Sequence, residues 1–223
     1  MNKIKSILVC DDHELYRSGL VRYVVDYFGE HPNVLEASDG LDALSIYNES
    51  NPDLVFLDIE MPGKNGIEVC KEIKSKNKDT LIIVVTMHTE KIVYSAVRNA
   101  KANGYLTKGA SKEEVEKCIT NVLKNPASFY TSAMDLFSSE EEYYAYERLI
   151  EQLNILTNSE KKVLQLVLEA KSSEEIAEMI FVSKKSVNNY RNHICRKLEL
   201  PSTNNSLNRW ATENNSALKV FFS

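Results

Sequence analysis

The feature that most constrains the fold is a fivefold alternation of short apolar runs and longer amphipathic segments over residues 1–124. The apolar runs are rich in Val, Ile and Leu without a strict period of two, which is typical of parallel strands buried on both faces. Such strand–helix units predict a five-stranded, parallel, doubly wound α/β sheet with right-handed crossovers. We expect strands at 4–10, 33–37, 53–58, 80–86 and 104–108, and helices at 14–28, 40–49, 66–77, 90–102 and 111–124.

The alternation stops at Asn125-Pro126, and the chain changes character. Residues 125–155 carry six acidic side chains against one basic side chain, with three tyrosines close together near the centre. We interpret this stretch as an acidic, partly helical linker, and a disordered tether is the alternative. It separates a first domain, 1–124, from a second domain, 156–223.

Three closely spaced helix starts follow in residues 156–223. Thr157 with Glu160, and Ser172 with Glu175, match the capping box, in which hydroxyl and carboxylate satisfy each other's backbone amides. Ser183 is a third N-cap candidate. Short helices with little room between them predict a small all-α helix-turn-helix domain. Its expected parts are a second helix at 172–180, a turn at Phe181-Val182, a recognition helix at 183–198 and a further helix at about 203–214 around Trp210.

Composition narrows the class of protein. With 43% hydrophobic and 26% charged residues, the chain is typical of a soluble globular protein rather than a disordered one. No apolar run is long enough to span a membrane, and charge interrupts the N-terminus too early for a signal peptide. The four cysteines are scattered, which argues against a zinc site or a disulfide framework. We therefore expect a reduced, cytoplasmic location without membrane contact.

One stretch is basic although the chain as a whole is acidic, with a net charge of −5. Residues 183–198 hold five basic side chains and no acidic one, on the expected recognition helix. Such a stretch indicates a local anionic partner, although an ordinary solvated helix face explains the charge equally well.

Polar side chains stand where four of the five predicted strands end. Asp11 and Asp12 follow the first strand, Asp58 ends the third, Thr86 the fourth and Lys108 the fifth. Because carboxyl ends of parallel strands share one edge, the three carboxylates should meet there and repel each other unless a cation lies among them. All-oxygen ligation suits Mg²⁺. At any one position, turn chemistry remains an alternative explanation for an aspartate.

This arrangement suits phosphoryl transfer to a carboxylate. With Mg²⁺ in place, Asp58 has an oxygen free to attack a phosphoryl donor. Lys108 and the cation would neutralise the phosphoryl oxygens, and Thr86 could donate its hydroxyl once the group arrives.

These motifs resemble two bacterial families. Residues 1–124 resemble a two-component receiver domain through V-C-D-D-H at 9–13, D-I-E-M-P-G-K-N-G at 58–66, V-T-M-H at 85–88 and G-Y-L-T-K-G-A at 104–110. Residues 156–200 resemble the LuxR-type helix-turn-helix through L-T-N-S-E-K-K-V-L, E-I-A-E-M-I, V-S-K-K-S-V and R-K-L. Together they resemble a response regulator of the NarL/FixJ type.

The resemblance implies roles for the residues of the first domain. Asp58 would accept phosphate from a sensor histidine kinase. Asp11, Asp12 and Asp58 would bind Mg²⁺, with the backbone carbonyl of Glu60 completing the site.

The resemblance also implies a switch pair formed by Thr86 and Tyr105. In this pair the Tyr105 ring turns inward as the Thr86 hydroxyl moves to the phosphoryl group. Tyr105 is equally consistent with ordinary core packing.

For the second domain, the resemblance implies binding to double-stranded DNA, with a homodimer forming on phosphorylation. Contacts to DNA phosphates would position the helix, whereas Asn188, Asn189 and Asn192 would contact bases, since Asn pairs well with adenine. These asparagines could instead bond only phosphates or water. The expected phosphate contacts are Lys184, Lys185, Arg191, Arg196 and Lys197.

One departure from the family pattern concerns the first helix of the motif, where Lys171 stands at the position of a usual helix-ending Gly, so that the helix should end differently.

The leading interpretation is a phosphorylation-controlled, DNA-binding transcription regulator that is not an enzyme. Two alternatives stay open. One is a receiver that acts through protein contacts without binding DNA, and the other is an aspartyl-phosphate phosphatase using Asp58, for which the chain lacks an insertion able to form a substrate cap.

Overall fold

The computed structural model describes residues 4–29, 32–131, 137–201, 205–215 and 218–219. These residues form two compact units that divide between Ser138 and Ser139. Each unit has its own core, and the two are described separately. Within the described residues, no helix has the length and apolar character needed to cross a membrane.

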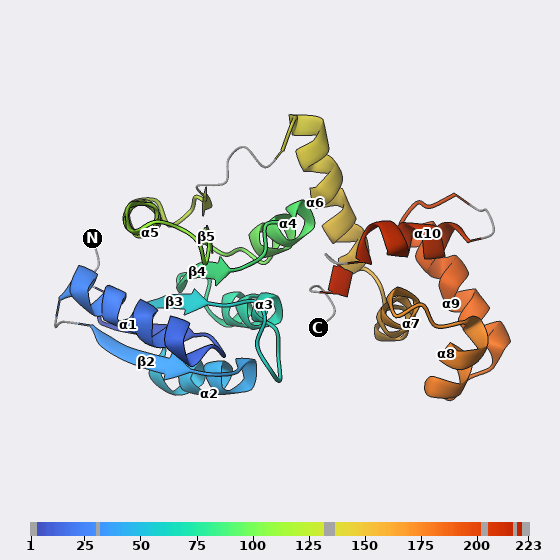
Figure 1. Ribbon diagram of the computed structural model, residues 1–223, viewed down its shortest axis with the longest axis horizontal. Helices are drawn as coiled ribbons and strands as arrows, with labels where there is room; N and C mark the ends of the chain where they lie inside the picture. The colour runs from blue at the N-terminus through green and yellow to red at the C-terminus, as the bar shows by residue number, and fades with distance from the viewer. Residues whose placement is uncertain (1–3, 30–31, 132–136, 202–204, 216–217, 220–223) are drawn as a thin grey trace. The chain divides into compact units, whose positions relative to one another are not determined.

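The first unit is built on one parallel sheet in the strand order β2-β1-β3-β4-β5-β6 (Figure 1). The strands in the middle of the sheet are buried along their whole length, as the continuous apolar runs predict. The strands are β1 Ser6–Cys10, β2 Asn33–Ala37, β3 Leu54–Leu57, β4 Leu81–Thr86, β5 Gly104–Thr107 and β6 Tyr130–Thr131.

Helices cover both faces of this sheet. Val24 of α1 and Ile119 of α5 pack with alternate strand residues such as Ile7 and Phe56 in one core. Figure 1 shows α5 on one side of the sheet and α3 and α4 on the other. The doubly wound α/β class predicted from the sequence is confirmed. The helices are α1 Glu14–Phe28, α2 Gly40–Ser50, α3 Gly66–Lys76, α4 Lys91–Asn99 and α5 Lys112–Lys124.

The predicted count of five strands is wrong by one. Tyr130–Thr131 adds a sixth strand, β6, parallel to β5, and the Tyr130 amide donates to the Asn103 carbonyl at 2.9 Å. A strand of two residues carries too little apolar pattern to be recognised from the sequence. The Asn103 side chain helps to fix this edge, because its amide nitrogen donates to the Pro126 carbonyl at 2.7 Å.

The second unit is all helical. Helices α7, α8 and α10 pack against α9 through the apolar stripes read from the sequence, and Val163, Ile176, Val187 and Ile194 are fully buried. The predicted helix-turn-helix fold is confirmed. Its helices are α6 Glu140–Asn154, α7 Asn158–Leu168, α8 Ser173–Met179, α9 Lys184–Lys197 and α10 Ser206–Glu213.

Helix α6 lies in the stretch assigned to the linker. Its two fully buried side chains, Ile150 and Leu153, stand near its C-terminal end. Arg148, on the same half of the helix, pairs with Glu199 beyond α9 through two hydrogen bonds of 2.7 Å. The C-terminal half of α6 is therefore packed into the second unit.

The helix starts follow the predicted capping chemistry. Thr157 with Glu160, and Ser172 with Glu175, form reciprocal capping boxes at α7 and α8. The Ser183 hydroxyl accepts from the Ser186 amide at 3.0 Å at the start of α9. These bonds satisfy amides that have no partner within the helix.

The helix ends depart from the sequence interpretation. The left-handed residue that ends α7 is Ala170, with φ of 59°, and not its neighbour Lys171. Phe181 in the predicted turn has φ of 56°, and Glu199 after α9 has φ of 53°. A side chain bearing Cβ is strained in this region, so these three helix ends adopt the backbone of a glycine C-cap without the glycine.

Candidate phosphoacceptor site and recognition face

One lysine joins two buried carboxylates at the edge of the first unit's sheet. The Lys108 Nζ atom lies 2.7 Å from Asp11 Oδ2 and 2.8 Å from Asp58 Oδ2. Asp11 and Asp58 are 2% and 3% exposed. The three residues directly follow β1, β3 and β5, so the structure brings these strand ends together as the sequence predicts.

Strand register explains why these side chains meet. Cys10 at the end of β1 pairs with Leu57 at the end of β3, so the residues that follow both strands emerge side by side. Gly66, at the start of α3, donates its amide to the Ile59 carbonyl at 2.8 Å. A Cβ atom at Gly66 would overlap the Asp58 carbonyl oxygen, so this close approach of helix and strand requires glycine.

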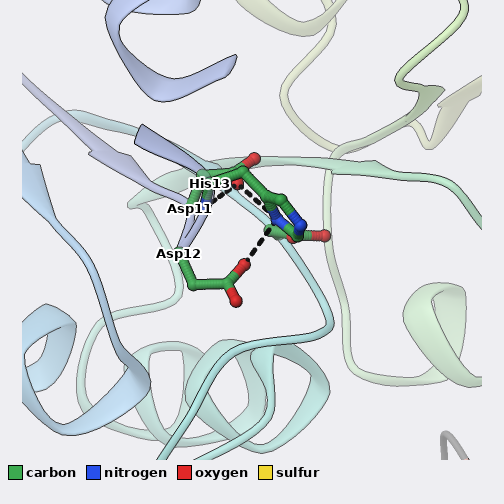
Figure 2. Close-up of side chains that lie close together, drawn as sticks. Asp11, Asp12 and His13 are labelled. Atoms are coloured by element: carbon green, nitrogen blue, oxygen red, sulfur yellow. Dashed lines mark hydrogen bonds and ion pairs between the residues drawn. The ribbon is translucent and has the colours of Figure 1, made fainter. Parts of the chain in front are cut away.

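Asp12, the neighbour of Asp11 in the sequence, faces solvent. Figure 2 shows the Asp12 carboxylate pointing toward the ring of His13, whose Nδ1 lies 2.8 Å from Asp12 Oδ1. The His13 backbone amide donates to Asp11 Oδ1 at 2.9 Å. Among the described residues, one oxygen or nitrogen each from Asp11, Asp12, His13 and Asp58 lie within 4.8 Å of one another.

The electrostatics of the site reflect this burial. Burial raises the pKa of Asp58, and the nearby Asp11 adds to the rise, whereas the bonds from Lys108 and from the Ile59 amide oppose it. For Lys108, burial lowers the pKa, but the hydrogen bonds to Asp11 and Asp58 outweigh it and leave the pKa above its usual value. The lysine therefore remains an ammonium between the carboxylates.

The switch candidates lie next to this site. Thr86 ends β4 and is buried, and its Oγ1 accepts from the His88 amide at 3.3 Å. The Tyr105 ring is also buried, and its hydroxyl donates to the His88 carbonyl at 2.7 Å. Tyr105 stacks edge-on against Tyr94 at 5.5 Å, and burial raises its pKa strongly. The inward ring combines core packing with a hydrogen bond to the loop after Thr86.

Glu60 borders the site through its side chain. Its Oε1 lies 3.3 Å from His88 Nε2, and Glu90 Oε2 lies 3.1 Å from the other ring nitrogen. His88 thus stands between two carboxylates at the rim of the site.

Two residues of α1 contact the site although they were not predicted from the sequence to belong to it. The Tyr16 ring centroid lies 4.8 Å from Lys108 Nζ. Arg17 donates to the Asp11 carbonyl at 2.7 Å and to Glu36 Oε2 at 3.0 Å, and so ties the acidic strand end to β2. Their position in the sequence could have indicated this contact, because both residues fall in the first turn of the helix that follows Asp11 and Asp12.

In the second unit, the exposed face of α9 carries much of the predicted recognition set. Members of this set recur at helical spacing and point away from the buried Val187 and Ile194. Lys184 pairs with Glu174 of α8. We call this the recognition face, and its residues are Lys184, Lys185, Asn188, Asn189, Asn192 and Arg196.

Two other basic residues predicted to contact DNA are bonded within the unit. Arg191 donates to Asn208 Oδ1 of α10 at 2.5 Å and is half-buried. Lys197 donates to Glu160 Oε2 at 2.6 Å and to the Ile155 carbonyl at 3.1 Å. Glu160 is only 3% exposed, so the Lys197–Glu160 pair joins the end of α9 to the start of α7.

Comparison with known proteins places both units in described families. Residues 7–120 match the response regulator receiver domain, and residues 154–207 match the luxR family of bacterial regulatory proteins. The response regulator UvrY of Escherichia coli (strain K12) is 33% identical over 198 residues, which cover 87% of this chain and 88% of UvrY. The transcriptional regulatory protein YxjL of Bacillus subtilis (strain 168) is 33% identical over 204 residues, with coverage of 88% and 91%.

The fold has a solved counterpart of the same two-part design. A structure of the RcsB response regulator of Salmonella typhimurium superposes with a TM-score of 0.53 at 22% identity, covering 93% of this chain and 98% of that one. At this identity the likeness concerns the fold.

Proposed function

This chain belongs to the response regulators that join a receiver domain to a LuxR-family domain, and from this premise we propose that it regulates transcription by binding DNA under the control of phosphorylation at Asp58. The observation that carries the proposal is the buried arrangement in which one ammonium bridges Asp58 and Asp11. We propose that residues 1–124 form the receiver domain, residues 125–155 the linker and residues 156–223 the DNA-binding domain.

Asp58 is the proposed phosphoacceptor. One carboxylate oxygen attacks phosphorus, the new oxygen–phosphorus bond forms, and the bond to the donor's leaving group breaks. A sensor histidine kinase is the proposed donor. Burial raises the pKa of Asp58, but the hydrogen bond from Lys108 opposes this rise and so favours the ionised oxygen that must attack phosphorus.

The neighbouring carboxylates fit a divalent cation. Asp11, Asp12 and Asp58 offer oxygens within the reach of one ion, and hard oxygen donors suit Mg²⁺. The carbonyl of Glu60 is the proposed additional ligand. When bound, the ion would neutralise charge on the phosphoryl oxygens.

Lys108 and Thr86 are proposed to receive the phosphoryl group. Lys108 would exchange its bond with Asp58 for one with a phosphoryl oxygen, because in the acyl phosphate the negative charge lies on the phosphoryl oxygens and no longer on the carboxylate. Thr86 would donate its hydroxyl to a second oxygen. Its movement would disturb the His88 backbone, to which the Tyr105 hydroxyl is bonded, and this shared contact is the proposed switch.

The recognition face is the proposed DNA-binding surface. Lys184, Lys185 and Arg196 would contact phosphates, and Asn188, Asn189 and Asn192 would reach bases in the major groove. Lys184, Arg191 and Lys197 would reach phosphates only by giving up their bonds to Glu174, Asn208 and Glu160. The proposed DNA-bound form is a homodimer produced by phosphorylation, acting in the cytoplasm.

The test compares the wild-type chain with Asp58→Asn. Incubation with phosphoramidate and Mg²⁺ should add one phosphoryl group to the wild type, detected by intact mass, and should add none to the variant. Sites selected from random DNA should be bound more tightly by the phosphorylated wild type only. Phosphodonor-dependent DNA binding by Asp58→Asn would contradict the proposal.

The same experiment separates the alternatives. Phosphorylation without binding to any selected DNA would favour a regulator that acts through protein contacts. Continuous release of phosphate from small phosphoesters would favour the phosphatase.

A further inference from the structure

Tyr16 lies against the third side of the Lys108 ammonium. Two sides of that ammonium are occupied by Asp11 Oδ2 at 2.7 Å and Asp58 Oδ2 at 2.8 Å. The Tyr16 ring centroid lies 4.8 Å away, within the range at which a cation is attracted to the face of an aromatic ring. The Lys108 side chain is only 8% exposed, so little water competes for this contact.

The ring is itself held in place. Tyr16 lies in the first turn of α1 and packs against the apolar core of the first unit. Burial raises the pKa of its phenol, the Lys108 charge lowers it, and Asp11 and Asp58 raise it further, with a net rise. The ring is therefore neutral at physiological pH and faces the ammonium as an uncharged aromatic surface.

Lys108 needs such a support because its contacts change during the reaction. A lysine ammonium is carried on four flexible carbons, and its position is set by its partners. When Asp58 becomes an acyl phosphate, its carboxylate charge is lost. Asp11 and Tyr16 are then the two contacts that remain from the unphosphorylated site.

We propose that Tyr16 is a positioning residue for phosphoryl transfer, which holds the Lys108 ammonium beside Asp58 through the face of its ring. This inference rests on the proposed function of Asp58. It assigns no proton transfer and no bond formation to Tyr16. The ring acts only through Lys108, and the phenol oxygen is dispensable.

The first test measures the rate at which phosphoramidate labels Asp58 by intact mass. Tyr16→Leu removes the aromatic face and should slow labelling by about fivefold, from the usual strength of a partly buried cation–aromatic contact. Tyr16→Phe keeps the face and should label at nearly the wild-type rate. Tyr23→Leu is the matched control, because Tyr23 lies on the same helix but its hydroxyl faces the Lys112 carbonyl.

The second test reads the contact without phosphorylation. In wild-type protein, the Lys108 Cε–Hε signal in carbon–proton NMR should be shifted upfield by the Tyr16 ring, with Lys108→Ala identifying the signal. The shift should persist in Tyr16→Phe and be lost in Tyr16→Leu. An unshifted signal in the wild type would overturn the inference even where a variant fails to fold.

The two levels of the proposal fail differently. If the wild type is never labelled at Asp58, the proposed function is wrong, and the role of Tyr16 is wrong with it. If the wild type is labelled and Tyr16→Leu keeps the wild-type rate, only the role of Tyr16 is wrong. Equal slowing by Tyr16→Phe and Tyr16→Leu would also overturn it, because the hydroxyl rather than the ring would then be responsible.

Discussion

The two units use charged side chains in opposite ways. In the receiver unit, the candidate reactive groups are buried and bonded to one another, with Lys108 between Asp11 and Asp58. In the helical unit, the six residues of the recognition face are exposed on α9, and the partly buried Lys197 pairs with the buried Glu160 away from that face. Buried charges therefore form the candidate reactive site in one unit and a structural pair in the other.

Two of the buried acids, one from each unit, show the difference most clearly. For Asp58, burial and Asp11 raise the pKa more than Lys108 lowers it. For Glu160, burial also raises the pKa, but the bonds from Lys197 and Thr157 outweigh it, so the pKa lies below its usual value. At neutral pH the charge on Glu160 stabilises its unit, whereas the charge on Asp58 is a strain within its own unit.

The largest expected effect breaks the structural pair. Glu160→Gln leaves Lys197 without its carboxylate partner, and we expect the helical unit to lose about 2 kcal/mol of unfolding free energy. Hydrogen–deuterium exchange of peptides from α7 and α9 measures this loss. Glu151→Gln, at an exposed position on α6, is the control and should leave protection unchanged.

Acid should have the same effect on the wild type. Because the pKa of Glu160 is lowered on folding, its stabilisation is present above the unfolded-state pKa and is lost as the pH falls through the folded-state value. Protection of α7 and α9 should therefore decrease as the solution is acidified below the usual glutamate pKa, and Glu160→Gln should flatten this decrease. A variant that keeps the wild-type acid dependence would contradict this account.

The next effect concerns the exposed face. Asn189→Ala should narrow the difference in affinity between selected and mismatched DNA by about tenfold, the usual contribution of one bidentate contact to a base. Lys185→Ala should instead weaken binding to all sequences and reduce its salt dependence by about one unit of slope. Titrations at several salt concentrations distinguish the two, and a change in salt slope for Asn189→Ala would show that it contacts phosphate.

The third prediction reverses the sign of the first. Asp58→Asn removes one of the carboxylates that repel each other at the candidate site, and we expect the receiver unit to gain about 1 kcal/mol of unfolding free energy. Calorimetry at neutral pH measures the gain. The advantage should shrink in acid, because the raised pKa allows wild-type Asp58 to be protonated there first. A loss of stability would mean that Lys108 already compensates the charge fully.

The smallest effect tests the strained helix ends. Ala170→Gly should raise the unfolding free energy of the helical unit by about 0.5 kcal/mol, since glycine relieves the left-handed backbone but adds entropy to the unfolded chain. Thermal melting measures the change. Lys171→Gly, one residue further on, has no left-handed backbone to relieve and should destabilise instead.

The sequence predicted the parts of the site that depend on strand ends. Asp11, Asp58 and Lys108 follow apolar runs that stop abruptly, and parallel pairing brings such ends together. The contacts of Tyr16 and Arg17 with the site were not predicted, because a residue in the first turn of a helix can point in several directions. The ion pair between Lys197 and Glu160 was not predicted for another reason. The two residues are 37 positions apart in the sequence and meet only because α7 packs on α9.

The two-residue strand β6 has a consequence for how the protein behaves at high concentration. It pairs with β5 and so occupies the backbone edge that a second chain would otherwise join. An edge this short is a poor template for another strand, and brief edges are one of the ways in which proteins avoid sheet-to-sheet aggregation. The small strand that the sequence did not predict therefore covers the backbone of Gly104 and Tyr105 on β5, which a neighbouring copy of the receiver can then no longer pair with.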